Sequence, residues 1–402
     1  MIKRTLQELC LNITDGKHGD CENEENSGYY FISCKDIFDG QINYKNARQI
    51  TKADFEETHK RTMLEVDDIL LTNSGTIGRM AFVTDREATT KTTFQKSVAI
   101  IKPDKQKVLP RYLYYQLQNC VPQFINSSNG SAQKNLLLST MRTFQIEIEE
   151  NREKQEKIAN TLSAYDDLIE NNQKQIKLLE ETAQRLYKEW FVDLRFPGHE
   201  NTKIVDGVPE GWNWCKLEDA IQFDPKVTLT KERMKQFVPM SALSTSSMVL
   251  DESQFTETTS NSGSKFQNGD TLLARITPCL ENGKTAYVSG LESDEGAVGS
   301  TEYIVMRAKT INAYMVYLLA RTDDFRQSAI NSMSGSDGRQ RVKSDKLKML
   351  DYLQPTSELV KEFGKIAGPT FEKIYKLSKQ MQQARQARDL LLPKLMSGEV
   401  EV

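Results

Sequence analysis

Polar residues suited to hydrogen bonding with nucleic acid gather in short loops in both halves of the chain. Asn, Gln and Arg present paired donors and acceptors that match base edges in the major groove, whereas Lys, Ser, Thr and glycine amides suit phosphate oxygens. A solvated turn is the alternative for any single loop. The recurrence of such loops in both halves favours a DNA-reading surface, with these candidates: Lys17, Asn73, Ser74, Thr76, Arg79, Gln95, Lys96, Ser131, Gln133, Lys134, Arg275, Thr277, Ser300, Ser336, Arg339, Gln340, Arg341 and Lys343.

Patterns typical of catalysis or metal binding are absent from the sequence. The stretch 282–285 (Asn-Gly-Lys-Thr) resembles the end of a phosphate loop, but Pro278 occupies the place of its first glycine and removes an amide donor. The three histidines, His18, His59 and His199, show no HExxH spacing, and the six cysteines form no CxxC pair. We therefore expect a non-catalytic chain that holds no metal and no cofactor of its own.

Charge and composition limit where such a surface could lie. The chain has 402 residues and a formal net charge of -3, so it is not a uniformly basic DNA-coating protein and any nucleic-acid surface must be local. Its longest apolar run, Tyr314 to Ala320, is far shorter than the ~20 residues of a membrane span. The start lacks the apolar core of a signal peptide, and the unpaired cysteines suit a reducing compartment, so we expect a cytoplasmic protein without a membrane segment.

The positioning elements repeat along the chain. Asp68-Ile69-Leu70-Leu71 recurs 202 residues later as Asp270-Thr271-Leu272-Leu273, and further matches follow at an offset of 205. Short β-branched or aromatic runs bounded by turn residues predict strands in each copy, and Pro110 to Gln118 predicts a helix. The later matches are 81–83 with 286–288, 98–102 with 303–307, and 130–131 with 335–336.

A long helix is predicted after each repeat. From Arg152 to Trp190 the apolar positions alternate by four and three, the seam of a coiled coil, and a shift of 205 residues gives a second seam. Gly364, Gly368 and Pro369 are expected to fray or interrupt the start of the second helix. The predicted seam residues are Ile158, Leu162, Tyr165, Ile169, Asn172, Ile176, Leu179, Leu186 and Trp190, then Phe363, Ile374, Leu377, Met381, Leu391 and Leu395.

Because one apolar seam cannot be buried alone, we expect the two helices to pair within the chain, antiparallel if a pseudo-two-fold axis relates the repeats. Packing of each helix on its own domain is the alternative. The predicted fold class is α+β, with two tandem mixed domains separated by two long helices that pair as an antiparallel coiled coil. The predicted boundaries are 1–149 and 213–355 for the domains, 150–195 and 356–397 for the helices, and 196–212 for the linker.

This order of domain, helix, domain and helix resembles the specificity subunit of a type I restriction-modification system over essentially the whole chain. The resemblance is carried by 68–71 with Gly75-Thr76-Ile77-Gly78, by 186–198 (LYKEWFVDLRFPG), and by Val208-Pro209-Glu210-Gly211-Trp212. The second copy departs from the pattern, since Arg275-Ile276-Thr277-Pro278-Cys279 replaces the glycine-containing loop. The equivalence of base-reading positions in the two copies is therefore an open question.

The resemblance implies two target-recognition domains, each reading one half of a bipartite double-stranded DNA target, with the paired helices setting the spacer. It also implies that two methyltransferase (M) subunits dock on this chain and that restriction/translocase (R) subunits join them. S-adenosylmethionine, ATP and Mg would then belong to the partners. Two alternatives remain: a recognition subunit of another restriction or modification assembly, and a coiled-coil scaffold with two protein-binding domains and no DNA role.

Overall fold

The computed structural model describes the chain except for residues 129–133, 294, 336–337 and 402. By internal contacts the chain divides into two compact units, and each is described by itself. Unit 1 comprises Met1–Asp167 with Ala384–Val402, and unit 2 comprises Leu168–Gln383. The division falls within both long helices, so each unit contains a segment of each helix.

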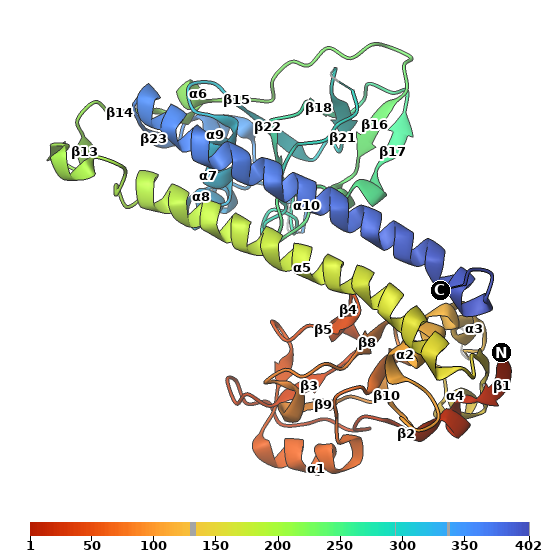
Figure 1. The fold of residues 1–402 in the computed structure, drawn as a ribbon. Coiled ribbons are helices and arrows are strands. Elements are labelled where there is room, and N and C mark those ends of the chain that lie inside the picture. Colours follow the sequence, from red (N-terminus) through yellow and green to blue (C-terminus); the bar gives the residue numbers. More distant parts are fainter. Residues whose placement is uncertain (129–133, 294, 336–337, 402) are drawn as a thin grey trace. The chain divides into compact units, whose positions relative to one another are not determined.

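Unit 1 is built on a four-stranded antiparallel sheet in the order β2-β10-β7-β8 (Figure 1). A three-stranded sheet β6-β3-β9, in which β3 and β9 are parallel, packs beside it, and β1 pairs with β11. The strands are β1 (Ile2–Thr5), β2 (Cys10–Asp15), β3 (Tyr30–Ile32), β4 (Ile37–Phe38), β5 (Gln41–Ile42), β6 (Arg48–Gln49), β7 (Ile69–Thr72), β8 (Met80–Phe82), β9 (Thr92–Phe94), β10 (Val98–Pro103) and β11 (Gln145–Ile148), and the short helices are α1 (Lys52–Thr62), α2 (Pro110–Asn119), α3 (Val121–Asn126) and α4 (Leu138–Thr143).

Unit 2 repeats this plan with the order β15-β22-β19-β20 in its main sheet and β17-β16-β21-β18 in its second sheet. The parallel pair β16–β21 corresponds to β3–β9, and β14–β23 corresponds to β1–β11. The strands are β12 (Ile204–Val205), β13 (Val208–Pro209), β14 (Asn213–Lys216), β15 (Ile221–Phe223), β16 (Lys235–Val238), β17 (Thr256–Thr258), β18 (Ser264–Phe266), β19 (Thr271–Ala274), β20 (Thr285–Tyr287), β21 (Ala297–Gly299), β22 (Tyr303–Ala308) and β23 (Asp351–Gln354), and the short helices are α6 (Leu217–Ala220), α7 (Ala313–Ala320), α8 (Asp323–Asn331) and α9 (Ser344–Lys348).

The predicted internal repeat is confirmed by these matching strand orders. Alternate residues of β7 enter two different cores: Ile69 and Leu71 pack with α2, whereas Leu70 packs toward the second sheet. In β19, Leu272 and Leu273 divide between two cores in the same way. Burial of both sheet faces explains why these strands are continuous apolar runs.

A buried ion pair recurs at equivalent positions of the two main sheets. Lys102 on β10 donates to Asp68 over 2.7 Å, and Arg307 on β22 donates to both carboxylate oxygens of Asp270 over 2.7 Å each. Both carboxylates also accept a backbone amide hydrogen bond three residues earlier in the chain. The repeated acid of the sequence is therefore structural, since it closes the turn that begins the central strand.

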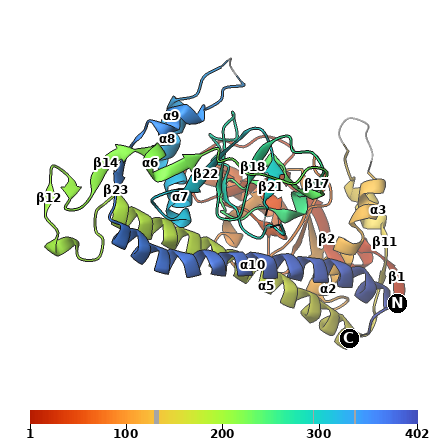
Figure 2. The ribbon, with the colours of Figure 1, turned by 90° about the horizontal axis from the view of Figure 1, so that it is seen from above.

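The long helices α5 (Arg152–Phe191) and α10 (Ser357–Ser397) lie side by side in Figures 1 and 2. Within unit 2, the rings of Trp190 and Phe363 are 5.6 Å apart and Asn172 donates to Gln380 over 3.1 Å. Within unit 1, Arg388 donates to Asp166 over 2.6 Å. In both units later residues of one helix contact earlier residues of the other, so the predicted antiparallel pairing is confirmed.

The seam residues differ in burial. Ten are buried and five are half-buried, as expected for a two-helix pair that leaves one side of the seam open. The buried ones are Ile158, Leu162, Ile169, Asn172, Ile176, Trp190, Phe363, Ile374, Leu377 and Leu395, and the half-buried ones are Tyr165, Leu179, Leu186, Met381 and Leu391.

The expected interruption at the start of the second helix is wrong, because α10 is continuous from Ser357 through Pro369. A Cβ atom on Gly364 would lie 3.3 Å from the Asn312 amide, and one on Gly368 would lie 3.2 Å from the Tyr314 hydroxyl. Asn312 also donates to the Val360 carbonyl over 2.8 Å. The glycines thus allow α7 to approach α10 closely, and this packing offsets their low helix propensity.

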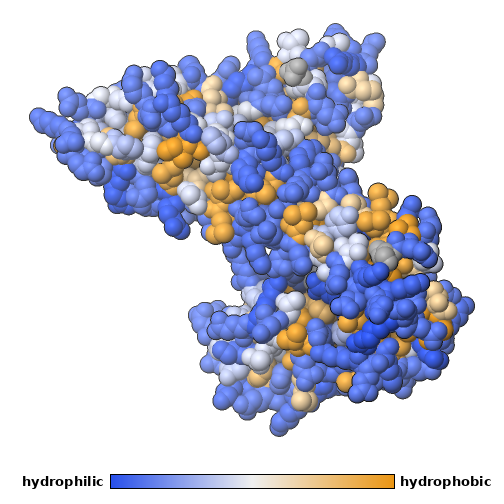
Figure 3. Space-filling model, viewed as in Figure 1, coloured by the Kyte–Doolittle hydropathy of each residue, from blue (hydrophilic) through white to orange (hydrophobic). Residues whose placement is uncertain are grey.

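The segment expected to be a linker is packed. Phe196 and Trp212 are both buried, with ring centroids 5.2 Å apart, and β12 pairs with β13 between them. Arg195 donates two hydrogen bonds to Glu189 and so ties the segment back to α5. Among the described helices none is long and apolar enough to cross a membrane, and hydrophilic side chains cover most of the face in Figure 3.

Candidate nucleic-acid interface

Two predicted site residues, Asn73 and Arg275, occupy the same place in the two main sheets. Asn73 follows β7, donates its backbone amide to the Ser97 carbonyl over 3.0 Å, and accepts from the Leu136 amide over 2.8 Å. Arg275, at the end of β19, donates to the Glu302 carbonyl over 3.0 Å and accepts from the Val342 amide over 2.9 Å. The same backbone frame therefore presents an amide side chain in unit 1 and a guanidinium in unit 2.

In unit 1, Asn73 lines an open hollow of about 650 Å³ together with the predicted residues Ser74 and Lys96. Asn73 is only 4% exposed, and its Oδ1 atom has no hydrogen-bond partner among the described residues. Ser74 forms a β-bridge with Asn135, which also lines the hollow. The structure thus brings three of the predicted residues to one concave surface that carries an unused acceptor.

Three further polar residues of this hollow were missed by the sequence interpretation. Asp15, at the end of β2, accepts hydrogen bonds from Arg61 on α1 and over 2.8 Å from His18. The side chain of Asp15 is only 7% exposed, so the two partners offset the cost of burying its charge. Nothing in the sequence indicated this cluster, because its members come from two separate segments, the end of β2 with the loop after it and the ordinary polar helix α1.

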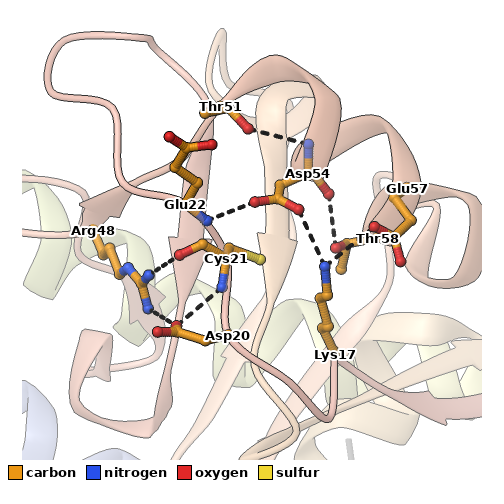
Figure 4. Close-up of polar contacts among 9 residues, drawn as sticks. All are labelled: Lys17, Asp20, Cys21, Glu22, Arg48, Thr51, Asp54, Glu57 and Thr58. Atoms are coloured by element: carbon orange, nitrogen blue, oxygen red, sulfur yellow. Dashed lines mark hydrogen bonds and ion pairs between the residues drawn. The ribbon is translucent and has the colours of Figure 1, made fainter.

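Lys17 lies in a neighbouring polar cluster rather than in the hollow (Figure 4). Its ammonium is 3.2 Å from carboxylate oxygens of both Asp54 and Glu57 on α1, and its side chain is 22% exposed. Asp54 also accepts from the Glu22 amide over 2.6 Å. On the other side of this loop, Arg48 donates to Asp20 over 2.5 Å. Lys17 therefore helps to fix the loop that follows β2, with its charge already matched by two acids.

Unit 2 has a corresponding hollow, also of about 650 Å³, in which Arg275 is the one predicted cation among the residues described. Lys226 and Lys231 from the loop after β15, and Lys265 from β18, also line it. Asp224 is the one carboxylate that the structure describes in its lining. These lysines were missed because each is an isolated surface cation in the sequence. They come together only because β18 contacts β22, through a hydrogen bond from Ser264 to the Tyr303 carbonyl, and β22 pairs with β15.

Arg341 and Gln340 lie beside this hollow. The Arg341 guanidinium donates to both oxygens of Glu302, with the shortest contact at 2.6 Å. These bonds hold the pKa of Glu302 below its usual range. The Gln340 carbonyl accepts from the Thr277 amide over 3.1 Å, and the Thr277 hydroxyl is buried without a partner among the described residues.

Among the other predicted residues, none that the structure describes lines either hollow. Ser300 is half-buried and donates its backbone amide to the Val238 carbonyl over 3.3 Å, and Gln95 is half-buried beside Lys17. Ser131, Gln133 and Ser336 lie outside the described residues. The exposed members are Thr76, Arg79, Lys134, Arg339 and Lys343.

A metal centre does not occur in the part of the chain that the structure describes, since no three His, Cys, Asp or Glu side chains converge there. The carboxylates of the two hollows are bonded to cations or to the backbone instead. Hydrogen-bond donors, acceptors and fixed positive charges are what these surfaces offer, and this chemistry suits binding rather than bond cleavage.

A known protein family matches the part of the chain that contains the first repeat. Residues 3–181 match the family described as "Type I restriction modification DNA specificity domain". This part of the chain is therefore similar to DNA specificity domains of the type I restriction-modification class, and the resemblance found in the sequence is confirmed.

Individual relatives extend the similarity beyond that domain. The chain is 27% identical over 386 residues to the type I restriction enzyme MjaIX specificity subunit of Methanocaldococcus jannaschii, which covers 92% of this chain and 87% of that protein. It is 34% identical over 140 residues to the EcoAI specificity subunit of Escherichia coli, covering 34% of this chain and 24% of that one. The crystal structure of a type I S subunit from M. genitalium matches 98% of this chain with a TM-score of 0.60 at 16% identity, so the fold is shared.

Proposed function

We propose that this chain is the specificity subunit of a type I restriction-modification enzyme and that it reads a bipartite DNA target. The observation that carries the proposal is the repeat of one sheet architecture with a polar hollow at the same place in each copy. Two related but chemically different surfaces suit two different half-sites. The chain itself supplies recognition and is not an enzyme, in line with the names of its relatives.

Residues 1–149 and 213–355 act as the two target-recognition domains in this proposal, and 150–195 and 356–397 form the helical spacer. A helix of 40 residues, the length of α5, corresponds to about 60 Å at 1.5 Å per residue. That length is enough to hold two half-sites roughly one to two DNA turns apart. Two methyltransferase subunits dock on the helices and domains, restriction subunits join them in the cytoplasm, and these partners bring S-adenosylmethionine, ATP and Mg.

The test is long-read methylation sequencing of the host genome with and without the gene. We expect methylation to disappear from one split motif with a fixed spacer. A matched control restores the gene and should restore the same motif. An unchanged methylome, with the gene expressed, would contradict the proposal and favour the scaffold alternative.

A domain exchange tests the division of labour. Replacing residues 1–149 with another recognition domain should change one half of the motif and leave the other half and the spacer intact. If both halves changed together, the two domains would not read separate half-sites.

A further inference from the structure

Asn73 and Arg275 differ in side-chain chemistry although they occupy equivalent positions in the two units. Each follows the central strand of its main sheet, and each is held by the same two backbone hydrogen bonds, to Ser97 and Leu136 or to Glu302 and Val342. In both units one bond goes to the residue before β10 or β22 and the other to the segment before α4 or α9, and together they fix the backbone. Only the side chain changes, from a short amide to a long guanidinium.

Each of the two side chains has hydrogen-bonding atoms without a partner among the described residues. Oδ1 of Asn73 is buried in the wall of the unit 1 hollow with no donor among the described residues, an arrangement that costs free energy unless a ligand supplies one. Nε of Arg275 donates to the Val342 carbonyl over 3.0 Å, and the structure gives its two Nη atoms no partner in the described part of the chain. Asn73 therefore offers an acceptor beside an amide donor, and Arg275 offers two parallel donors.

These patterns match different bases. An Asn amide pairs with the N6 donor and N7 acceptor of adenine, whereas the paired donors of Arg match the O6 and N7 acceptors of guanine. We propose that Asn73 and Arg275 are equivalent specificity-determining residues, Asn73 reading an adenine in one half-site and Arg275 a guanine in the other. This inference rests on the proposed function, and it assigns to each unit one base at one position.

The surroundings support this role. The Asn73 hollow also contains the amide of Asn135 and the ammonium of Lys96, which can serve a neighbouring base and a phosphate. Around Arg275, three lysines supply phosphate-binding charge. Arg341, the residue directly before Val342, is bonded to Glu302. Arg275 is therefore the one guanidinium among the described residues that line the hollow.

The experiment changes the hydrogen-bond donors and acceptors of one side chain at a time, in the complex that co-purifies with this chain. Arg275→Gln replaces the paired donors that match guanine with a shorter amide side chain that matches adenine, so one guanine of one half-site should become adenine. Asn73→Asp leaves a carboxylate that accepts from cytosine N4, so one adenine of the other half-site should become cytosine. The preference for the original base should fall about 5- to 150-fold in each case.

The readouts are competitive binding to a library with every base varied at each motif position, and methylation sequencing of cells that carry each variant. Asn46→Asp and Arg86→Gln change the same residue types outside the two hollows and should leave the motif unchanged. Arg275→Lys should retain the guanine. These variants show that any change of motif comes from the hydrogen-bond pattern at the two positions.

The possible outcomes distinguish failure of the proposed function from failure of the base assignments to Asn73 and Arg275. If the wild-type complex shows no split motif, the proposed function fails. If it shows one that both Arg275→Gln and Asn73→Asp leave unchanged, or one that lacks adenine in one half and guanine in the other, the inference is overturned while the function stands. Should Asn73→Asp fail to fold, Arg275→Gln alone decides, since that side chain lines an open surface.

Discussion

The two units share their sheets and differ in what those sheets present. In unit 1, α1 contributes Arg61 to the hollow, where Asp15 accepts from it. In unit 2, strands β17 and β18 flank the second sheet, and β18 contributes Lys265. The described lining of the first hollow has Arg61 and Lys96 as its Arg and Lys cations, whereas that of the second has four such cations, and each has one carboxylate.

Buried, mostly apolar residues make up both central strands, whereas the residues directly after them, Asn73 and Arg275, differ in length and charge. Both central strands put alternate residues into two cores, so a polar substitution there would be costly. Side chains at the ends of the strands face hollows, where changes of charge and length are tolerated. Under the proposed function, two half-sites of different sequence would be read from one duplicated architecture.

The largest effect is expected from removing the acid of the bidentate buried pair. Asp270→Ala leaves Arg307 without its partner and should lower the unfolding free energy by about 3 to 5 kcal/mol. Asp68→Ala in unit 1 should cost less, because its single bond to Lys102 compensates less of the desolvation. Urea denaturation of both variants measures the difference. The double variant Asp270→Ala/Arg307→Met should recover part of the lost unfolding free energy. Equal losses in Asp270→Ala and Asp68→Ala would contradict the expected difference between the two units.

A pH dependence should distinguish Asp68. Burial raises its pKa to about 6, although Lys102 opposes the shift. Since the unfolded value is about 3.9, the folded state binds the proton more tightly, and the unfolding free energy should fall as pH rises from about 4 to about 6, by at most about 3 kcal/mol.

The measurement is denaturation between pH 4 and pH 8 for the wild type and Asp68→Asn. The variant should lose this component of the slope, while Asp85→Asn, which changes an exposed acid, should keep it. A slope that is identical in Asp68→Asn and the wild type would remove Asp68 as its source.

A smaller effect is expected at the polar break in the helix pair. Asn172 is 1% exposed, and it donates to the Leu377 carbonyl over 3.4 Å and to Gln380 over 3.1 Å. Asn172→Leu should change stability by only about 1 kcal/mol and weaken the preference for one register. Cross-linking of cysteine pairs placed across the seam measures the register, with Ile176→Leu as the apolar control. A single register in Asn172→Leu would show that the unit cores set it instead.

The smallest effect concerns Arg341, whose guanidinium is held by Glu302. At the position equivalent to Glu302, unit 1 has Ser97, with no such charge. Glu302→Gln should free Arg341 for DNA and steepen the dependence of binding on salt by up to about one unit of log K against log salt. Titrations of the complex at several salt concentrations measure the slope. Glu257→Gln, on exposed β17, should leave it unchanged.

Periodicity and repetition in the sequence were enough to predict the repeated strands and the pair of long helices. The runs 69–71 and 98–102 predicted strands because they are short, β-branched or aromatic and bounded by turn residues. The 3.5-residue seam predicted the helix pair because an apolar stripe needs a partner. The start of α10 was the exception, since close packing of α7 on Gly364 and Gly368 outweighed their propensity.

The composition of the two hollows was decided only by tertiary structure. Asp15, His18 and Arg61 meet because β2 and α1 pack together. Lys226, Lys231 and Lys265 meet because β18 contacts β22, which pairs with β15. Local sequence carries no signal for such convergence, since each residue alone is an ordinary surface charge. The sequence by itself therefore determined the repeated architecture and the residue types at its strand ends. Which of those residues share a surface, and which charges are already neutralised there, depended on long-range packing.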